Sequence, residues 1–152
     1  MKRSNFLIFG IFALIVAASA VTVLAQSSGR DNPTAMTSNE LSGSLNPNNL
    51  ENYYSFTAGP GELTITVEVQ ARHEDIGVLN FELLGRNAST ALLCCEFAQG
   101  DNGGTGRDVK TIKLAKRQSI ILHTTTGPVG GGTFHIRFSG ATAKEAGGKH
   151  GE

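Results

Sequence analysis

Hydrophobic and polar residues alternate along the middle of the chain, from Glu62 to Arg72. Polar residues separate the apolar positions, which are Leu63, Ile65, Val67, Val69 and Ala71. A period of two over this length predicts a β-strand with one buried and one solvated face. The same alternation returns near the C-terminus, where Phe134, Ile136 and Phe138 are separated by polar residues. Both segments are therefore predicted strands of a half-buried sheet.

Weaker apolar runs of strand length fill most of the remaining chain. They span residues 41–45, 53–57, 78–84, 91–97, 109–114 and 119–125. Clusters of Asn, Pro and Gly separate several of these runs, as turns between strands require. No segment after residue 25 shows a helical stripe. About eight short strands at this spacing predict an all-β fold, an antiparallel jelly-roll-like β-sandwich spanning residues 41–140.

The first 25 residues have the layout of a secretory signal peptide. Lys2 and Arg3 precede an apolar run from Phe6 to Ala18, and small residues before Gln26 offer a cleavage site after Ala25. The uncharged stretch is also long enough to span a bilayer, so a retained membrane anchor is the alternative. Either reading predicts an exported protein, periplasmic or extracellular. Polar residues 26–40 are then a flexible linker and residues 141–152 a disordered tail.

Removal of the signal segment changes what the composition says. The whole chain has 13 basic and 13 acidic side chains, and residues 26–152 keep 11 and 13 of them, a net charge of −2. A nucleic-acid-binding protein would show a clustered basic excess instead. Glycine makes up 18 of these 127 residues, about twice the usual share of roughly 7%. This abundance agrees with many turns between short strands.

Three stretches of the chain resemble the bacterial pre-peptidase C-terminal domain. They are Gly43-Ser44-Leu45, then Asn52 to Gly59 with the alternating strand that begins at Leu63, and finally Gly132 to Phe138. The resemblance covers residues 41–140 and implies a jelly-roll sandwich. It further implies a non-catalytic module that is appended to secreted enzymes, aids secretion or attachment to surfaces, and in some members binds calcium. Here no catalytic domain accompanies the module, and Glu51 is the one carboxylate where the family often has several.

Two segments are candidates for metal chemistry. Asp101, Asn102 and Asp108 flank a Gly-rich loop whose oxygen atoms could start a calcium site, to which Glu51 is a weaker addition. The closing Glu of an EF-hand is missing, so a mobile Gly-rich loop is the alternative. Zinc is disfavoured because the histidines lack the pairwise spacing of zinc ligands.

Cys94 and Cys95 form the most unusual dipeptide of the chain. Adjacent residues of a strand point to opposite faces, which predicts one buried and one exposed cysteine. Small apolar packing residues, a vicinal disulfide and an intermolecular disulfide through the outward thiol are the three alternatives.

The sequence favours a binding protein over an enzyme. It contains no nucleophile elbow, metalloprotease helix, P-loop or dinucleotide fingerprint. We therefore predict a secreted, non-catalytic binding or adhesion module that attaches to a protein, polysaccharide or cell-envelope surface. Its binding surface is either the loops at one end of the sandwich or the polar face of the central strand, made by Thr64, Thr66, Glu68 and Gln70. Two alternatives remain: a structural subunit of an envelope or extracellular assembly, and an accessory of a separately encoded secreted peptidase.

Overall fold

The computed structural model of the protein describes residues 27–46, 51–85, 91–127 and 130–142. The predicted signal peptide and residues 143–152 of the predicted tail lie outside this range. The described residues form eight strands and no helix. The strands are β1 (Thr34–Ala35), β2 (Glu40–Leu45), β3 (Glu51–Ala71), β4 (Ile76–Gly85), β5 (Ala91–Asp101), β6 (Thr105–Leu114), β7 (Gln118–Thr126) and β8 (Gly132–Thr142).

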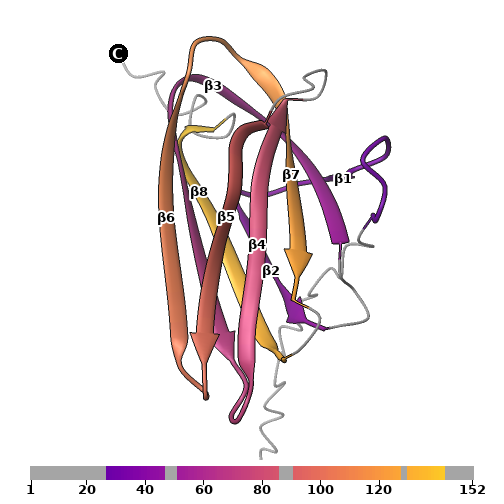
Figure 1. Ribbon diagram of the computed structural model, residues 1–152. Coiled ribbons are helices and arrows are strands. Elements are labelled where there is room, and N and C mark those ends of the chain that lie inside the picture. The colour runs from indigo at the N-terminus through magenta and orange to yellow at the C-terminus, as the bar shows by residue number, and fades with distance from the viewer. Residues whose placement is uncertain (1–26, 47–50, 86–90, 128–129, 143–152) are drawn as a thin grey trace, which may run out of the picture.

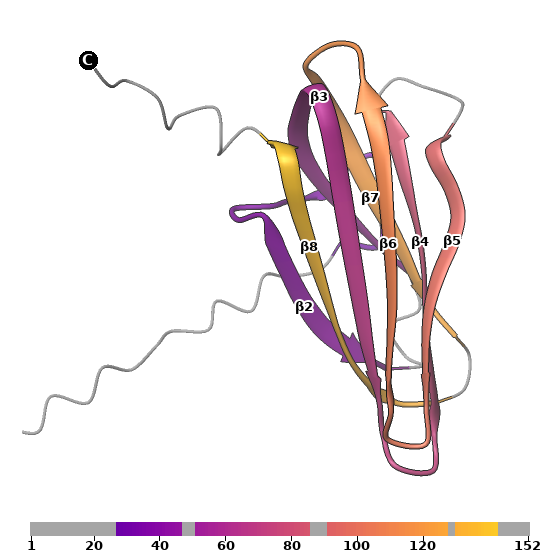
Figure 2. The ribbon, with the colours of Figure 1, turned by 90° about the vertical axis from the view of Figure 1, so that its left-hand side faces the viewer.

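The strands make two layers that face each other, as Figures 1 and 2 show. One layer has the order β2-β8-β3-β6 and uses the second half of β3, residues 61–71. The other has the order β1-β3-β7-β4-β5 and uses the first half of β3. All of these pairs are antiparallel except β1 with β3. The predicted all-β antiparallel sandwich is confirmed.

Strand β3 joins the two layers because it bends in its middle. The two predicted strands at residues 53–57 and 62–72 are thus one strand of 21 residues. Gly59 and Gly61 have φ angles of 89° and 128°, which a side chain would disfavour, and Pro60 between them donates no backbone hydrogen bond. These three residues turn the strand without ending it.

The core lies between the layers and is built by the alternation seen in the sequence. Leu63, Ile65, Val67 and Val69 of β3 are at most 1% exposed, and the polar residues between them face outward. The other layer contributes inward-pointing residues of the same kind, chiefly Tyr54, Leu79, Phe81, Leu83, Ile120 and Leu122. For the two alternating segments, residues 62–72 and 134–138, the predicted buried face is the face that the core uses.

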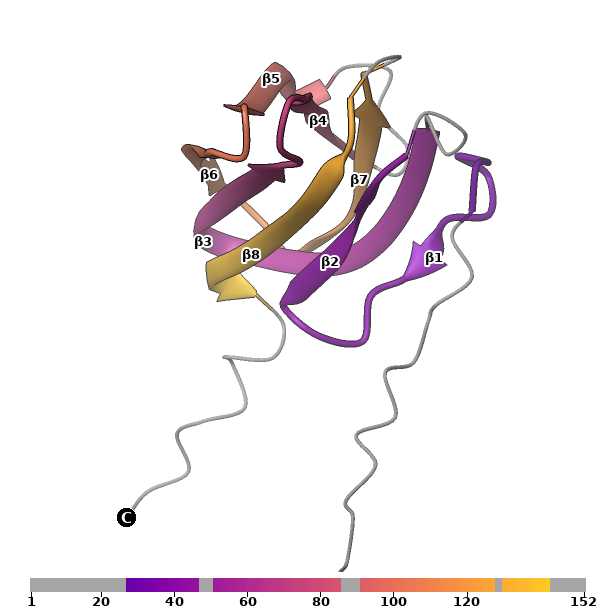
Figure 3. The ribbon, with the colours of Figure 1, turned by 90° about the horizontal axis from the view of Figure 1, so that it is seen from below.

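The segment predicted as a flexible linker runs along the sandwich. Strand β1 lies within it and pairs with β3, and the backbone of Ser27 forms a bridge to Tyr53. The connection from β1 to β2 crosses from one layer to the other (Figure 3). Hydrogen bonds from Met36 N to Ser55 O (2.8 Å) and from Phe138 N to Asn39 O (2.8 Å) fix the two ends of this crossing. At the other end of the chain, β8 continues to Thr142, two residues into the predicted tail.

Candidate functional site

The four predicted surface residues of β3 lie together on the outer face of the β2-β8-β3-β6 layer. Thr64 and Thr111 share a hydrogen bond of 2.9 Å between their hydroxyl groups, and Glu68 lies 3.4 Å from Arg107. Gln70 hydrogen-bonds the hydroxyl of Thr105 and the backbone of the β5–β6 turn, and Thr66 lies opposite Val109. We call the outward residues of these four strands the polar face.

Several charges on the polar face are paired with one another. On its β2 side, Glu40 lies 2.9 Å from Arg137 and 3.7 Å from His135. Each of these ion pairs is solvent-exposed, so it adds little to stability and orients its side chains instead. A ligand on the polar face would have to compete with this internal pairing.

A groove of about 530 Å³ opens where the β1–β2 crossing passes over the edge of both layers. It is lined by Ala35, Met36, Thr37, Ser38, Asn39, Ser55, Phe56, Thr57, Arg117, Ser119 and Phe138. These residues come from the crossing, the first half of β3, the start of β7 and the end of β8. The groove is therefore made by four segments that are distant in the sequence.

The groove combines an aromatic pair with a polar rim. The rings of Phe56 and Phe138 lie 4.4 Å apart between centroids and are tilted by 40°. Phe138 is 3% exposed, and Phe56 packs partly buried against the core, so both rings are held in place. Around them the lining supplies hydroxyl groups and one amide, whereas Arg117 supplies the one charge among the lining residues. Arg117 is exposed and has no ion-pair partner among the described residues.

A second polar cluster lies on the outer face of the other layer. The imidazole of His123 stacks on the ring of Tyr53, with centroids 4.4 Å apart and an interplanar angle of 5°. Its Nδ1 lies 2.7 Å from Oε1 of Glu82, and its Nε2 lies 2.9 Å from Oε1 of Glu51. Tyr53 donates a hydrogen bond of 2.6 Å to the same Glu51 oxygen. We call these four residues the histidine cluster.

The histidine cluster changes the acidity of two of its members. The pKa of Glu51 is lowered, mainly by the hydrogen bond from Tyr53. Burial opposes this effect by raising the pKa, and the contact with His123 lowers it further. Partial burial, followed by the hydrogen bond to Glu51, raises the pKa of Tyr53 to about 12. Within the described chain, His123 contacts two carboxylates and a phenol, and none of these is the Ser or Cys of a nucleophilic pair. We interpret the cluster as a cross-strand contact of β3, β7 and β4.

The predicted calcium ligands are not gathered in one place. Asn102 Oδ1 accepts a hydrogen bond from Glu74 N, and Asp108 Oδ1 accepts one from Val109 N and lies 3.6 Å from Lys110. Asp101 is in β5 and Asp108 in β6, whereas Glu51 belongs to the histidine cluster. Across the described ranges, no group of three or more His, Cys, Asp or Glu is arranged to hold a metal ion.

Calcium binding by the β5–β6 loop stays a prediction, and heat denaturation tests it. On this hypothesis, millimolar calcium is expected to raise the melting temperature, because a ligand that binds only the folded state stabilises it. Asp101→Asn should abolish the rise, and Glu51→Gln should preserve it because Glu51 lies in a different cluster. Equal melting temperatures in calcium and in a chelator would contradict the hypothesis.

The cysteines are joined to each other by a disulfide, one of the three alternatives left open by the sequence. Both are exposed, so the prediction of one buried and one exposed cysteine is wrong. The reason is a bulge, because β5 advances through residues 93–96 while its partner β4 advances through residues 81–83. The extra residue breaks the alternation of faces, and Cys95 has a φ angle of 63°.

The described residues contain no helix that is long and apolar enough to cross a membrane. Comparison with known proteins finds similarity to solved structures alone. No protein-family model matches the chain, and no curated protein matches it either. The sandwich is similar to a pre-peptidase C-terminal domain. That domain, from a Bacillus anthracis collagenase, is 16% identical, and the match covers 71% of this chain and 95% of that chain with a TM-score of 0.45.

Two further similar structures have names of carbohydrate-binding modules. One is a CBM4 structure with 11% identity, 60% coverage of each chain and a TM-score of 0.43. The other is the CBM36-1 domain of a multidomain xylanase from the hindgut metagenome of Trinervitermes trinervoides. It is 17% identical, covers 62% of this chain and 75% of that chain, and has a TM-score of 0.36. A member of the family that the sequence resembles is therefore present among the similar structures.

Proposed function

We propose that this protein is an exported, non-catalytic binding module that holds an acidic polysaccharide chain in the groove beneath the β1–β2 crossing. The observation that carries the proposal is the lining of that groove, which places an aromatic pair, several hydroxyl groups and an unpaired guanidinium around one concavity. Concave sites with an apolar floor and a few polar groups are the usual form of a ligand site. Export rests on the predicted signal segment.

The aromatic pair and the rim match the two kinds of surface of a sugar ring. A sugar presents C–H groups on its faces and hydroxyl groups at its edge. The ring of Phe56, which packs on the buried ring of Phe138, offers an apolar floor for the C–H groups, while Ser55, Thr57 and Ser119 carry hydroxyls that can donate and accept. This arrangement supplies both contacts without a Trp, which the sequence lacks.

The charge of the groove favours a sugar that carries a carboxylate. The lining contains Arg117 and no Asp or Glu, so its formal charge is positive, although residues 26–152 are slightly acidic as a whole. A guanidinium binds a carboxylate through two parallel hydrogen bonds, which fixes orientation as well as adding affinity. A polyuronate is therefore the polymer that the groove fits best.

Arg117→Ala is expected to weaken binding of polygalacturonate about 10- to 100-fold, because a hydrogen bond to a charged group contributes about 1.5–3 kcal/mol. Retardation of the purified protein in native gels that contain polygalacturonate gives the affinity. Lys116→Ala is the matched control, since it removes the same charge from the neighbouring residue, which does not line the groove. Added salt should reduce the affinity of the wild type more than that of Arg117→Ala.

Variants of the polar face decide between the two surfaces. If Glu68→Gln or Thr66→Ala weakens binding and Arg117→Ala does not, the ligand lies on the polar face and the groove proposal is wrong. Equal retardation by polygalacturonate and by neutral dextran would contradict the preference for a carboxylate. Absence of retardation by every polysaccharide tested would leave the sequence-based alternatives of an assembly subunit or a peptidase accessory.

A further inference from the structure

The Cys94–Cys95 disulfide ties no distant parts of the fold together. It links residues that are already neighbours in the chain, with a sequence separation of 1. A disulfide stabilises a fold mainly by closing a loop of the unfolded chain, and this gain vanishes when the loop contains no residues between the cysteines. Breaking the bond therefore releases no segment. The chemistry available to this disulfide is local.

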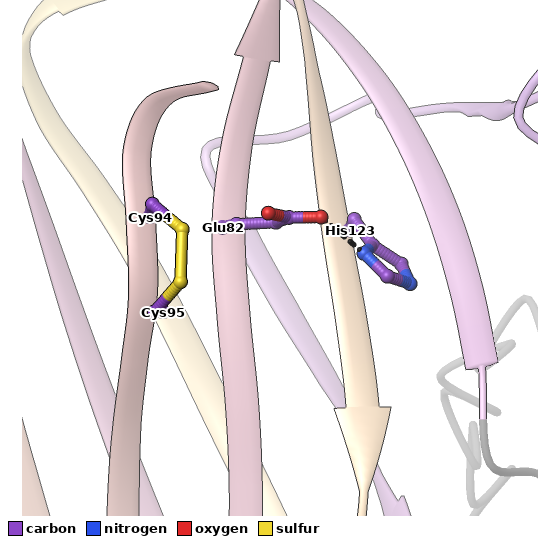
Figure 4. The surroundings of a disulfide bond; sticks show 4 residues. All are labelled: Glu82, Cys94, Cys95 and His123. Atoms are coloured by element: carbon purple, nitrogen blue, oxygen red, sulfur yellow. Dashed lines mark hydrogen bonds and ion pairs between the residues drawn. A yellow bond between two sulfur atoms is a disulfide. The ribbon is translucent and has the colours of Figure 1, made fainter. Parts of the chain in front are cut away.

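The disulfide is accessible from outside the sandwich. Both cysteines are exposed, and β5 is the last strand of its layer, so no further strand covers them. Figure 4 shows the two side chains on the same side of β5, next to Glu82 of the neighbouring strand. Two residues further along β5, the side chain of Phe97 is 58% exposed. A thiol-bearing molecule can thus reach a sulfur atom without any opening of the core.

We propose that Cys94 and Cys95 form a thiol-exchange site that accepts two electrons from an external thiol. An external thiolate attacks one Sγ, the bond between the two sulfur atoms breaks, and its electron pair leaves on the other Sγ, which takes up a proton. A second external thiol then attacks the mixed disulfide. Overall, one protein disulfide and two external thiols give two protein thiols and one external disulfide, so atoms and electrons balance.

Adjacency of the cysteines determines which product accumulates. In the mixed disulfide, the freed cysteine lies next to the sulfur that carries the external group, and it can expel that group again. A single external thiol is therefore held only transiently by the wild type. Completion of the reaction needs a second external thiol. A dithiol supplies both external thiols from one molecule. The site accordingly favours dithiol partners over monothiols.

Alkylation under native conditions tests the site. The purified protein is incubated with reduced glutathione or with a reduced thioredoxin-class protein dithiol. The reaction is quenched with iodoacetamide, and the mass of the intact protein is measured by mass spectrometry. We expect two alkylated cysteines to appear with each reductant, faster with the dithiol, while the circular dichroism spectrum and melting temperature stay unchanged. Cys94→Ser/Cys95→Ser is the control, since it should keep the same melting temperature and take up no label.

The single variants test the role of the second cysteine. Cys94→Ser and Cys95→Ser lack the neighbouring thiol, so each should keep glutathione as a stable mixed disulfide after treatment with oxidised glutathione. The wild type, first reduced to two thiols and then given the same treatment, should return to its disulfide without keeping the adduct, and accumulation of the adduct there would overturn the resolving role. Labelling of the wild type only in denaturant, or two free thiols in protein purified under oxidising conditions, would overturn the site itself. These outcomes do not depend on polysaccharide binding, so the two proposals fail separately.

Discussion

Gly106→Ala is expected to lower the free energy of unfolding by about 3 kcal/mol, because the added methyl group has no room. Gly106 lies in β6 opposite Val69, where the β5–β6 hairpin folds back across the end of β3. A Cβ atom at this position would overlap the carbonyl oxygen of Gln99 and would also approach Gly100 N. Both neighbours are backbone atoms, so no side chain can move aside. Either the hairpin must shift or the β3–β6 pairing must open at this end.

Urea denaturation of the wild type and the variant measures this effect. Gly29→Ala is the matched control, since the nearest atom to an added Cβ there is Ser27 Oγ at 3.8 Å, an ordinary contact. The control should stay within about 0.5 kcal/mol of the wild type. A Gly106→Ala variant as stable as Gly29→Ala would show that β5 and β6 can move apart at this end of the hairpin, and the close approach of their backbones would then not be required by the fold.

The strand positions could be predicted because the buried and the solvated face of a strand require different residue types. Inward residues such as Ile65 and Ile136 are buried in the hydrophobic core, and outward residues such as Glu68 face water, so each step along the strand alternates between the two environments. The bend in β3 was less visible, because Gly59-Pro60-Gly61 has the composition of a turn. A turn was predicted at these residues, whereas in the structure β3 continues through them.

The groove could not be predicted because no local pattern encodes it. Its lining comes from four segments, and one of them, residues 35–39, has the polar composition of a linker. Strand β1 is two residues long, too short for an alternation to be seen. The aromatic pair joins Phe56 to Phe138, which are 82 positions apart in the sequence. Only the pairing of β3 and β8 with their neighbours brings these rings together.

The cysteine pair shows a different limit of pattern reading. Alternation of faces holds along β5 as long as each residue has one partner in β4, and at the bulge two residues of β5 share the place of one. A single inserted position was enough to expose both sulfur atoms.

The groove and the thiol-exchange site lie at opposite edges of one layer, the groove beside β1 and the thiol-exchange site on β5. Occupation of one leaves the other open.

Tyr54→Phe is expected to make the protein more stable than the wild type in alkaline solution. Tyr54 is fully buried between the layers, and its hydroxyl group has no hydrogen-bond partner among the described residues. Burial raises its pKa to about 12, against 10.0 for an exposed tyrosine. The unfolded chain therefore loses this proton first, so the contribution is intact below about pH 10 and is lost as the pH rises toward 12. A shift of this size corresponds to about 2–3 kcal/mol.

The difference in unfolding free energy between Tyr54→Phe and the wild type, measured at pH 7 and above pH 10, isolates this effect. At pH 7 the variant should be equal to the wild type or more stable by up to about 1 kcal/mol, because it removes a buried hydroxyl that has no partner. The advantage should grow with pH, whereas the titration of Lys110 and of Tyr53 affects both proteins equally and cancels. Tyr53→Phe serves as the comparison: it also removes a tyrosine with a pKa of about 12, but it breaks the hydrogen bond to Glu51 and costs stability already at pH 7. A constant difference between Tyr54→Phe and the wild type from pH 7 to pH 12 would mean that Tyr54 ionises no later in the folded protein than in the unfolded chain, and hence that its hydroxyl group is reached by water.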